Sequence, residues 1–501
     1  MKRTSLTTAV IAGIAGVAGI SNMASAVYLN NDGVGSVLVY PYYTVNANNT
    51  TAITVVNTTS LGKAVKVRFL EAYDSREVLD FNLYLSPFDL WTAQVVPVGT
   101  GAGVYSNDNS CTVPALPKTS GAAVAFSSAG YDGSVTTQPN DGGPKSLTRT
   151  LEGYVELIDM GSVVNTDAST LDAISHSGGV PASCGQVVKA WSGGGYWQAD
   201  PTVDITKVYG GLFGSGTIIN VGLGTIEGYN ADAIDQFYAP GDLVNHHSTP
   251  SSLTPSIASA TSKTSYVFAP AGAGLTSTLA VTPYPVAVDA VSSLFMADSV
   301  FNEYWTAGGT AANSEWVINF PTKRFYVDPF IVTGAGNATP VPTLSGPPAN
   351  RPFDVKFTSF AGGTSCAAIG LSFFDREEGT SSTGVSFSPL PVTGTSLCYE
   401  AQVVTFNQGK LPSAVLGSAL AQNISTGFNN GWAKIDLYGA SPANHVLTST
   451  ASGNTFQGLP VTGFWVAQLV NGNLGGVLSN YSSLYRHKLH RTCTSGGLAC
   501  S

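Results

Sequence analysis

The 501-residue chain is acidic, with a formal net charge of −9 at pH 7, and only 11% of its residues are charged. An acidic surface does not neutralise phosphates, so this balance argues against a nucleic-acid partner. A hydrophobic fraction of 43% and an aromatic fraction of 10% exclude intrinsic disorder, whereas 56 glycines and 27 prolines favour strands joined by tight turns.

Residues 1–26 predict an export signal. Lys2 and Arg3 give a positive start, an apolar run covers residues 6–20, and residues 24–26 form a small-residue cleavage site before Val27. The apolar run is too short for a durable membrane span, so we expect no integral span after cleavage. The leader holds two basic residues and no acidic one, so the mature chain would carry a charge of −11. We therefore expect an exported protein: extracellular, at the cell surface or periplasmic.

Residues 27–160 predict a first, immunoglobulin-like β-sandwich. Short apolar runs occur at 37–40, 52–56, 65–70, 80–85, 91–96 and 153–159, and turn residues bound them. In the third run Lys66 and Arg68 alternate with apolar residues. This period predicts a strand with one face in water.

Residues 161–312 predict a loop-rich middle segment with short helices. We expect a strand at 216–221, a helix at 231–238, a polar connection at 240–262 and helical spacing at 292–305.

Residues 313–501 predict a second β-sandwich with a basic tail. Strand-like runs recur at 316–320, 324–327, 353–357, 369–373, 402–406, 433–437 and 463–467. The predicted fold is therefore mainly all-β, with two sandwiches, a mixed middle segment and long loops.

The six cysteines predict disulfides, because an even number in an exported chain is typical of bonded pairs. The sequence does not choose among the connectivities. Our hypothesis joins neighbours along the chain: Cys111 with Cys184, Cys366 with Cys398, and Cys493 with Cys500.

Four segments, 65–91, 152–160, 316–328 and 458–471, together resemble a group of proteins secreted by Gram-negative bacteria. The resemblance spans most of the mature chain. It implies a bacterial envelope setting, and it carries no activity and no catalytic residue over to this chain.

Two clusters are candidate metal or acid–base sites. His487 and His490, at helical spacing beside Cys493 and Cys500, could ligate zinc, although a disulfide explains the sulfurs better in an oxidising compartment. Asp375, Glu377 and Glu378 could bind calcium or act in hydrolysis, but Arg376 lies among them and favours a charged turn. We expect no cofactor, with calcium as the weaker alternative.

Other polar and aromatic groups favour ordinary structural roles. His246 and His247 are adjacent, so their rings point apart in extended backbone and a solvated loop is favoured. The aromatic groups Tyr40, Tyr42 and Tyr43, and Trp191, Tyr196 and Trp197, could stack on sugars, but core packing and loop anchoring are more common.

The sequence thus indicates an exported, non-catalytic structural or adhesive protein that contacts an envelope or extracellular polymer or associates with itself. A carbohydrate-binding module is one alternative, marked by a solvent-exposed aromatic cluster on a sheet face. A secreted hydrolase using the carboxylates near Asp375 is the other, marked by a cleft with a second acid opposite.

Overall fold

The computed structural model describes residues 26–118, 121–135, 140–241, 245–247, 254–270, 277–306, 312–328, 351–353, 362–379, 395–409, 411–438, 445–496 and 498–500. Strands make up 49% and helices 10% of the structure, in several sheets with a sandwich-like arrangement. The predicted fold class is confirmed. None of the helices in the described ranges has the length and apolar character needed for a membrane crossing.

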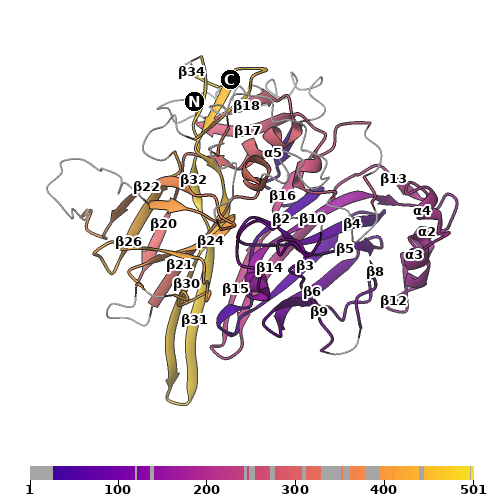
Figure 1. Cartoon of the computed structure of the whole chain (residues 1–501), viewed down its shortest axis with the longest axis horizontal. Coiled ribbons are helices and arrows are strands. Elements are labelled where there is room, and N and C mark those ends of the chain that lie inside the picture. Colours follow the sequence, from indigo (N-terminus) through magenta and orange to yellow (C-terminus); the bar gives the residue numbers. More distant parts are fainter. Residues whose placement is uncertain are drawn as a thin grey trace, which may run out of the picture.

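The largest sheet of the described residues contains ten strands, the first beginning at residue 26 and the last ending at residue 283 (Figure 1). Its strand order is β18-β17-β1-β16-β2-β10-β4-β5-β8, and β13 also pairs with β10. The strands are β1 (Ala26–Leu29), β2 (Val37–Thr44), β4 (Gly62–Glu71), β5 (Glu77–Leu85), β8 (Cys111–Val113), β10 (Glu152–Val163), β13 (Ile205–Thr206), β16 (Asp232–Asp235), β17 (Thr264–Pro270) and β18 (Ser277–Pro283).

A six-stranded sheet has the order β15-β14-β3-β6-β7-β9, and its apolar side chains share one core with the ten-stranded sheet. Its strands are β3 (Thr50–Asn57), β6 (Leu90–Val98), β7 (Gly101–Tyr105), β9 (Val124–Ala125), β14 (Leu212–Asn220) and β15 (Thr225–Asn230). In β3 every second residue is buried, the pattern of a strand with one face on the core.

Two five-stranded sheets form the C-terminal part, and the stacked rings of Tyr304 and Phe406, 4.7 Å apart, join them. The first has the order β23-β22-β26-β20-β32: β20 (Ser299–Trp305), β22 (Ala367–Phe374), β23 (Thr395–Leu397), β26 (Asn430–Asp436) and β32 (Lys488–His490). The second has the order β25-β24-β21-β30-β31: β21 (Ala312–Asn319), β24 (Ala401–Phe406), β25 (Ala421–Ile424), β30 (Thr462–Leu474) and β31 (Val477–Arg486).

Smaller elements complete the described fold. The short strands are β11 (His176–Ser177), β12 (Val180–Pro181), β19 (Met296–Ala297), β27 (Val446–Thr448), β28 (Asn454–Gln457), β29 (Leu459–Pro460), β33 (Cys493–Ser495) and β34 (Leu498–Ala499). The helices are α2 (Thr170–Ile174), α3 (Cys184–Ala190), α4 (Tyr196–Ala199), α5 (Ala287–Phe295) and α6 (Arg324–Val327), with 3₁₀ turns η1 (Asn46–Asn48), η2 (Leu147–Leu151) and η3 (Ile257–Ser259).

Three element predictions are wrong. The expected helix at 231–238 contains strand β16, because this segment pairs with β1 on one side and β2 on the other. The segment 292–305, whose spacing predicted a helix, contains the end of α5 and then strand β20. The expected strand at 324–327 is helix α6, where Arg324 reaches Asp328 one turn later at 3.1 Å. The strand expected at 353–357 lies outside the described residues from 354 onward.

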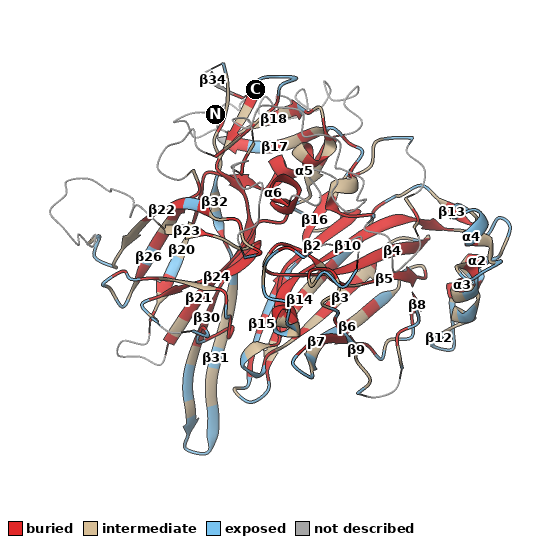
Figure 2. Ribbon diagram, in the orientation of Figure 1, coloured by how far each residue is buried: buried red, intermediate tan, exposed pale blue. Residues whose placement is uncertain are grey.

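The prediction of a wet face on β4 is also wrong, because β2, β4 and β10 are buried throughout (Figure 2). Lys66 pairs with Asp80, while Arg68 contacts Glu77 and Glu156 at 2.7 Å each. The segment around η3 crosses this face, since the Ile257 N–H donates to Glu156. Acidic residues on the neighbouring strands therefore neutralise Lys66 and Arg68, which the sequence pattern predicted to face solvent.

Candidate functional site

The outer face of the sheet β23-β22-β26-β20-β32 carries aromatic and charged side chains in register. Strand β26 pairs with β22 and β20, which places Phe374, Trp432 and Glu303 in one row. Trp305 follows two residues after Glu303 and shares its face. The Trp432 residue is 42% exposed, and its ring stacks on Phe374 with centroids 4.3 Å apart. This face therefore presents aromatic rings to solvent.

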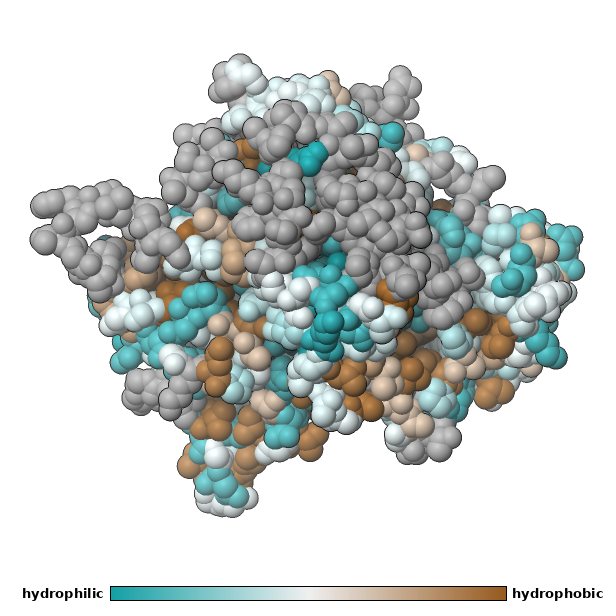
Figure 3. Space-filling view, viewed as in Figure 1, coloured by the Kyte–Doolittle hydropathy of each residue, from teal (hydrophilic) through white to brown (hydrophobic). Residues whose placement is uncertain are grey.

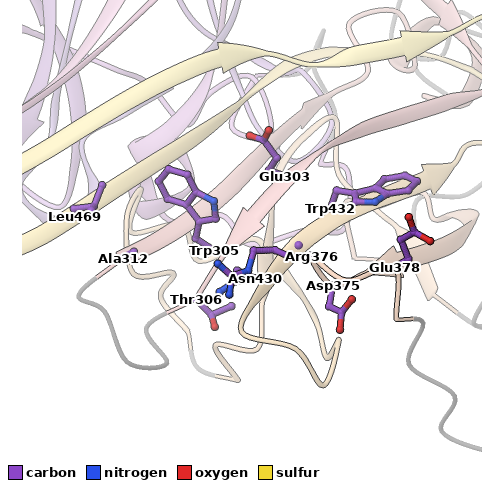
Figure 4. Close-up of a pocket in the computed structure, with 11 residues that line it drawn as sticks. Glu303, Trp305, Thr306, Ala312, Asp375, Arg376, Glu378, Asn430, Trp432 and Leu469 are labelled. Atoms are coloured by element: carbon purple, nitrogen blue, oxygen red, sulfur yellow. The ribbon is translucent and has the colours of Figure 1, made fainter.

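Two adjoining hollows lie over this face, with volumes of about 630 and 520 Å³. Trp305, Trp432 and Glu303 line both. Figure 4 shows the two indoles on opposite sides of the first hollow, with the Glu303 carboxylate between them. The first hollow is also lined by Thr306, Ala312, Asp375, Arg376, Glu378, Asn430, Gly431 and Leu469, and the second by Phe301, Asn302, Trp465, Tyr485 and Lys488.

The second hollow extends the aromatic surface onto the neighbouring sheet. Trp465 of β30 stacks on Tyr485 of β31 with centroids 5.2 Å apart, and Trp305 meets Trp465 edge-on at 5.3 Å. Tyr485 is 54% exposed. We call Trp305, Trp432, Phe374, Trp465 and Tyr485 the aromatic platform.

The predicted carboxylates near Asp375 lie at the rim of the first hollow. One Asp375 oxygen accepts hydrogen bonds from the backbone N–H groups of Glu377 and Gly379, at 2.8 and 2.6 Å. Asp375 therefore fastens the turn that follows β22, as the charged-turn alternative expected. Asp375 and Glu378 line the first hollow, and the hollow also contains Glu303, which the sequence did not single out.

The predicted histidine pair of the tail is not on a helix: His490 is the last residue of β32, and His487 lies between β31 and β32. His487 is buried between Val317 and Asn302, at 2.8 and 2.6 Å, and its burial lowers its pKa to about 4. His490 is on the surface, 2.7 Å from Asp298. Across the described ranges, no three His, Cys, Asp or Glu side chains come together as a metal-binding group would.

The structure contains the three disulfides of the neighbour hypothesis: Cys111–Cys184, Cys366–Cys398 and Cys493–Cys500. The first attaches helix α3 to strand β8, and the third closes the tail. Disulfides of this kind fit an exported protein, because oxidising compartments preserve them.

His246 is buried, so the prediction of a solvated loop is wrong for this residue. It is 2% exposed, and its ring packs against Trp191 and Trp197 with centroids 4.9 and 4.7 Å away. Tyr84 also contacts the imidazole, at 2.9 Å. These rings form a satellite core that anchors the helices α2–α4 on the large sheet. The loop-anchoring alternative is confirmed, and Tyr40, Tyr42 and Tyr43 are likewise fully buried.

A buried ionic cluster, which the sequence did not reveal, joins the turn after β4 to distant segments. Arg149 donates to Glu71 and Asp74 at 2.7 and 2.6 Å, and Tyr131 and Tyr73 flank its guanidinium. Burial opposes ionisation of Glu71, but Arg149 and the hydrogen bonds from Asp74 and from the Arg76 backbone N–H together outweigh burial and lower the pKa of Glu71 to about 2. With these side chains sealed from water, their opposite charges neutralise one another inside the protein.

Alternation in β26 could have identified Trp432 as an exposed ring of the aromatic platform. In β26, Trp432 shares a period of two with Lys434 and Asp436, whereas Ala433 and Ile435 face the core. An indole on the polar face of an amphipathic strand indicates an exposed ring. The convergence of β20, β22 and β30 around Trp432 depends on sheet order, which one sequence does not provide.

The platform thus has two exposed rings, Trp432 and Tyr485, and two partly buried ones, Phe374 and Trp305, while the buried Trp465 supports Tyr485. Hydrogen-bond donors and acceptors line the same hollows. Comparisons with protein-family models, with curated proteins and with solved structures find no match to this chain.

Proposed function

We propose that this is an exported, non-catalytic adhesive protein that binds a polysaccharide of the cell envelope or exterior through the aromatic platform. The observation that carries the proposal is the pair of indoles, Trp305 and Trp432, on either side of Glu303 over an open sheet face. The export signal of residues 1–26, the acidic balance and the three disulfides support the compartment.

The chemistry of sugars matches this surface. A pyranose ring has a face of C–H groups that packs against the negative face of an indole, and a rim of hydroxyls that both donate and accept hydrogen bonds. Glu303 accepts, whereas Arg376 and Lys488 donate. Two hollows sharing a pair of indoles suit consecutive units of a chain better than a single compact ligand.

The test is retention on a panel of immobilised polysaccharides, followed by calorimetric titration with soluble fragments. We expect Trp432→Ala to weaken binding by about fivefold, because one stacked ring contributes about 1 kcal/mol. Phe268→Ala is the matched control, since Phe268 is 64% exposed and lies outside both hollows. Absence of retention on every polysaccharide, or equal affinity of Trp432→Ala and the parent, would refute the proposal.

A secreted hydrolase is the second candidate, and Glu303 is the observation that favours it. This carboxylate shares the first hollow with Asp375 and Glu378, and two acids across a cleft are the usual machinery of glycoside hydrolysis. The same panel separates the two functions. Release of reducing ends that disappears in Glu303→Gln, with binding retained, would establish the enzyme. Under the adhesive proposal we expect no release from any polysaccharide.

A further inference from the structure

A long hairpin formed by β30 and β31 projects from the C-terminal part of the molecule, and its end is exposed (Figure 2). Four apolar residues lie close to its Gly475–Gly476 turn. Leu474, Val477, Leu478 and Tyr481 are 60%, 65%, 52% and 62% exposed. On the visible surface, apolar side chains gather along this projection and beside it (Figure 3). A two-stranded hairpin alone is marginally stable in water, so such a surface favours a covered state.

The projection is free of charge. No Asp, Glu, Lys or Arg occurs between Asp436 and Arg486, although 11% of the whole chain is charged. The neighbouring β14–β15 hairpin has the same character, because residues 212–226 contain no charged side chain and Val221 at its turn is 83% exposed. The two hairpins touch, since Asn480 donates to the Leu223 carbonyl at 2.8 Å.

The apolar residues occupy both faces of the projection, which bears on what covers it. Val477 and Leu478 are consecutive in β31, so their side chains point to opposite faces. Leu478 lies beside Gly224 of the β14–β15 hairpin and is still 52% exposed, whereas Val477 is on the other face and is 65% exposed. A protein surface would cover one face and leave the other in water. An apolar medium that surrounds the hairpin covers both, and the absence of charge removes the main cost of entering it.

Backbone groups at the hairpin end are largely satisfied from within. At the irregular register between Val470 and Asn473, the Asn471 side chain donates to the Ser479 carbonyl at 2.9 Å, and Asn480 accepts from the Gly472 N–H at 2.8 Å. The open outer edge of a hairpin still excludes deep entry into hydrocarbon. Shallow entry, about 5–10 Å, is the depth typical of interfacial segments.

We infer that the β30–β31 hairpin, flanked by the β14–β15 turn, inserts its end into the interfacial region of a lipid bilayer. Leu474, Val477 and Leu478 enter, while Tyr481, about 16 Å from the turn at about 3.3 Å per residue, lies at the headgroup level that tyrosine favours. Because the end has no cation, the bilayer it recognises is uncharged or zwitterionic, and attachment does not depend on salt.

Vesicle flotation tests this inference with the whole mature protein. We expect flotation with phosphatidylcholine vesicles, equal at low and high salt, and about tenfold weaker for the triple variant Leu474→Ser, Val477→Ser, Leu478→Ser. Phe88→Ser is the control, because Phe88 is 70% exposed and lies elsewhere. If the triple variant fails to fold, Val477→Ser and Leu478→Ser are tested singly, and each must weaken flotation.

Sedimentation without lipid decides between a bilayer and a second copy of the chain. We expect a monomer for both the parent and the triple variant. Self-association that the triple variant abolishes, without vesicle binding by the parent, would overturn the inference. Flotation only with vesicles containing phosphatidylglycerol would also overturn it.

Discussion

Hydrogen bonds around His246 fix which of its nitrogens carries the proton. The carbonyl of Pro201 can only accept, so Nδ1 donates to it at 2.8 Å and Nε2 accepts from the Tyr84 hydroxyl at 2.9 Å. That hydroxyl accepts in turn from the Trp191 indole at 2.8 Å. A proton on Nε2 would break this chain inside an aromatic core, and burial lowers the pKa of His246 to about 4.

This residue predicts acid sensitivity. The ordinary pKa of histidine is 6.5, so as the pH falls the unfolded chain takes up the proton first. The stability that neutral His246 contributes is complete above pH 6.5 and is lost between 6.5 and about 4, by about 3 kcal/mol in total. Urea unfolding across this interval should show a smaller pH dependence for His246→Gln than for the parent. Equal slopes would contradict the prediction.

At the scale of elements, the edges of two sheets meet through a serine instead of backbone pairing. Ser482 of β31 accepts from the Ile226 N–H at 3.1 Å and donates to the Ile226 carbonyl at 3.0 Å, so it satisfies both backbone groups of one residue in β15. Edge strands with free backbone groups invite pairing with other chains. The Ser482 hydroxyl therefore occupies the backbone groups of β15 with which another chain could pair. It also holds the side of the β30–β31 hairpin against β15.

Ser482→Ala should remove this protection. We expect a loss of about 1 kcal/mol, the usual net value of a hydrogen bond, and faster hydrogen exchange in the peptide that contains Ile226. Ser483→Ala, one residue along on the opposite face, is the control. Mass spectrometry after exchange measures both variants, and equal exchange in the two would show that the serine bridge has no protective role.

The positions of several strands could be predicted from the sequence, because alternating apolar residues and turn residues are signals within a short segment. The runs at 37–40 and 402–406 lie within β2 and β24, and the run at 433–437 lies in β26 up to Asp436. The helix expected at 231–238 failed because pairing with β1 and β2 outweighs local preference. The sequence singled out Asp375 and Glu378, which line the candidate site. It did not single out Trp305 and Trp432, because their meeting depends on which strands are neighbours.

At the scale of the whole molecule, the buried ionic cluster connects segments far apart in the chain. Arg76 contacts Asp74 of its own turn and Asp328 at the end of α6, at 3.3 and 3.0 Å. Arg324 of the same helix donates to the Ser75 carbonyl at 2.7 Å. One hydrophobic core also continues from Val27 to Cys500. The N-terminal and C-terminal parts of the described chain therefore share both a polar and an apolar junction.

Removing one cation from this junction should be costly. Arg149→Met leaves the buried Glu71 without its cation and Asp74 with Arg76 alone, and we expect a loss of about 3–5 kcal/mol. Lys145→Met is the control, because Lys145 is exposed, and its effect should stay within about 0.5 kcal/mol. Denaturant unfolding measures both. A loss below about 1 kcal/mol for Arg149→Met would show that water or rearranged side chains replace the guanidinium.

The position of β1 inside the ten-stranded sheet has a consequence for the timing of assembly. Tyr28 pairs with Asp235, 207 residues later, and Ala26 pairs with Thr264. At about 5–20 residues per second, a ribosome takes roughly 10–40 seconds to supply the first of these partners. Until Val163 is synthesised, β2, which ends up between β16 and β10, lacks both neighbours, and for the rest of that interval it lacks β16. The apolar strand β2 of the nascent chain is therefore uncovered during this part of synthesis. A holdase chaperone that binds β2 would protect the chain most at this stage.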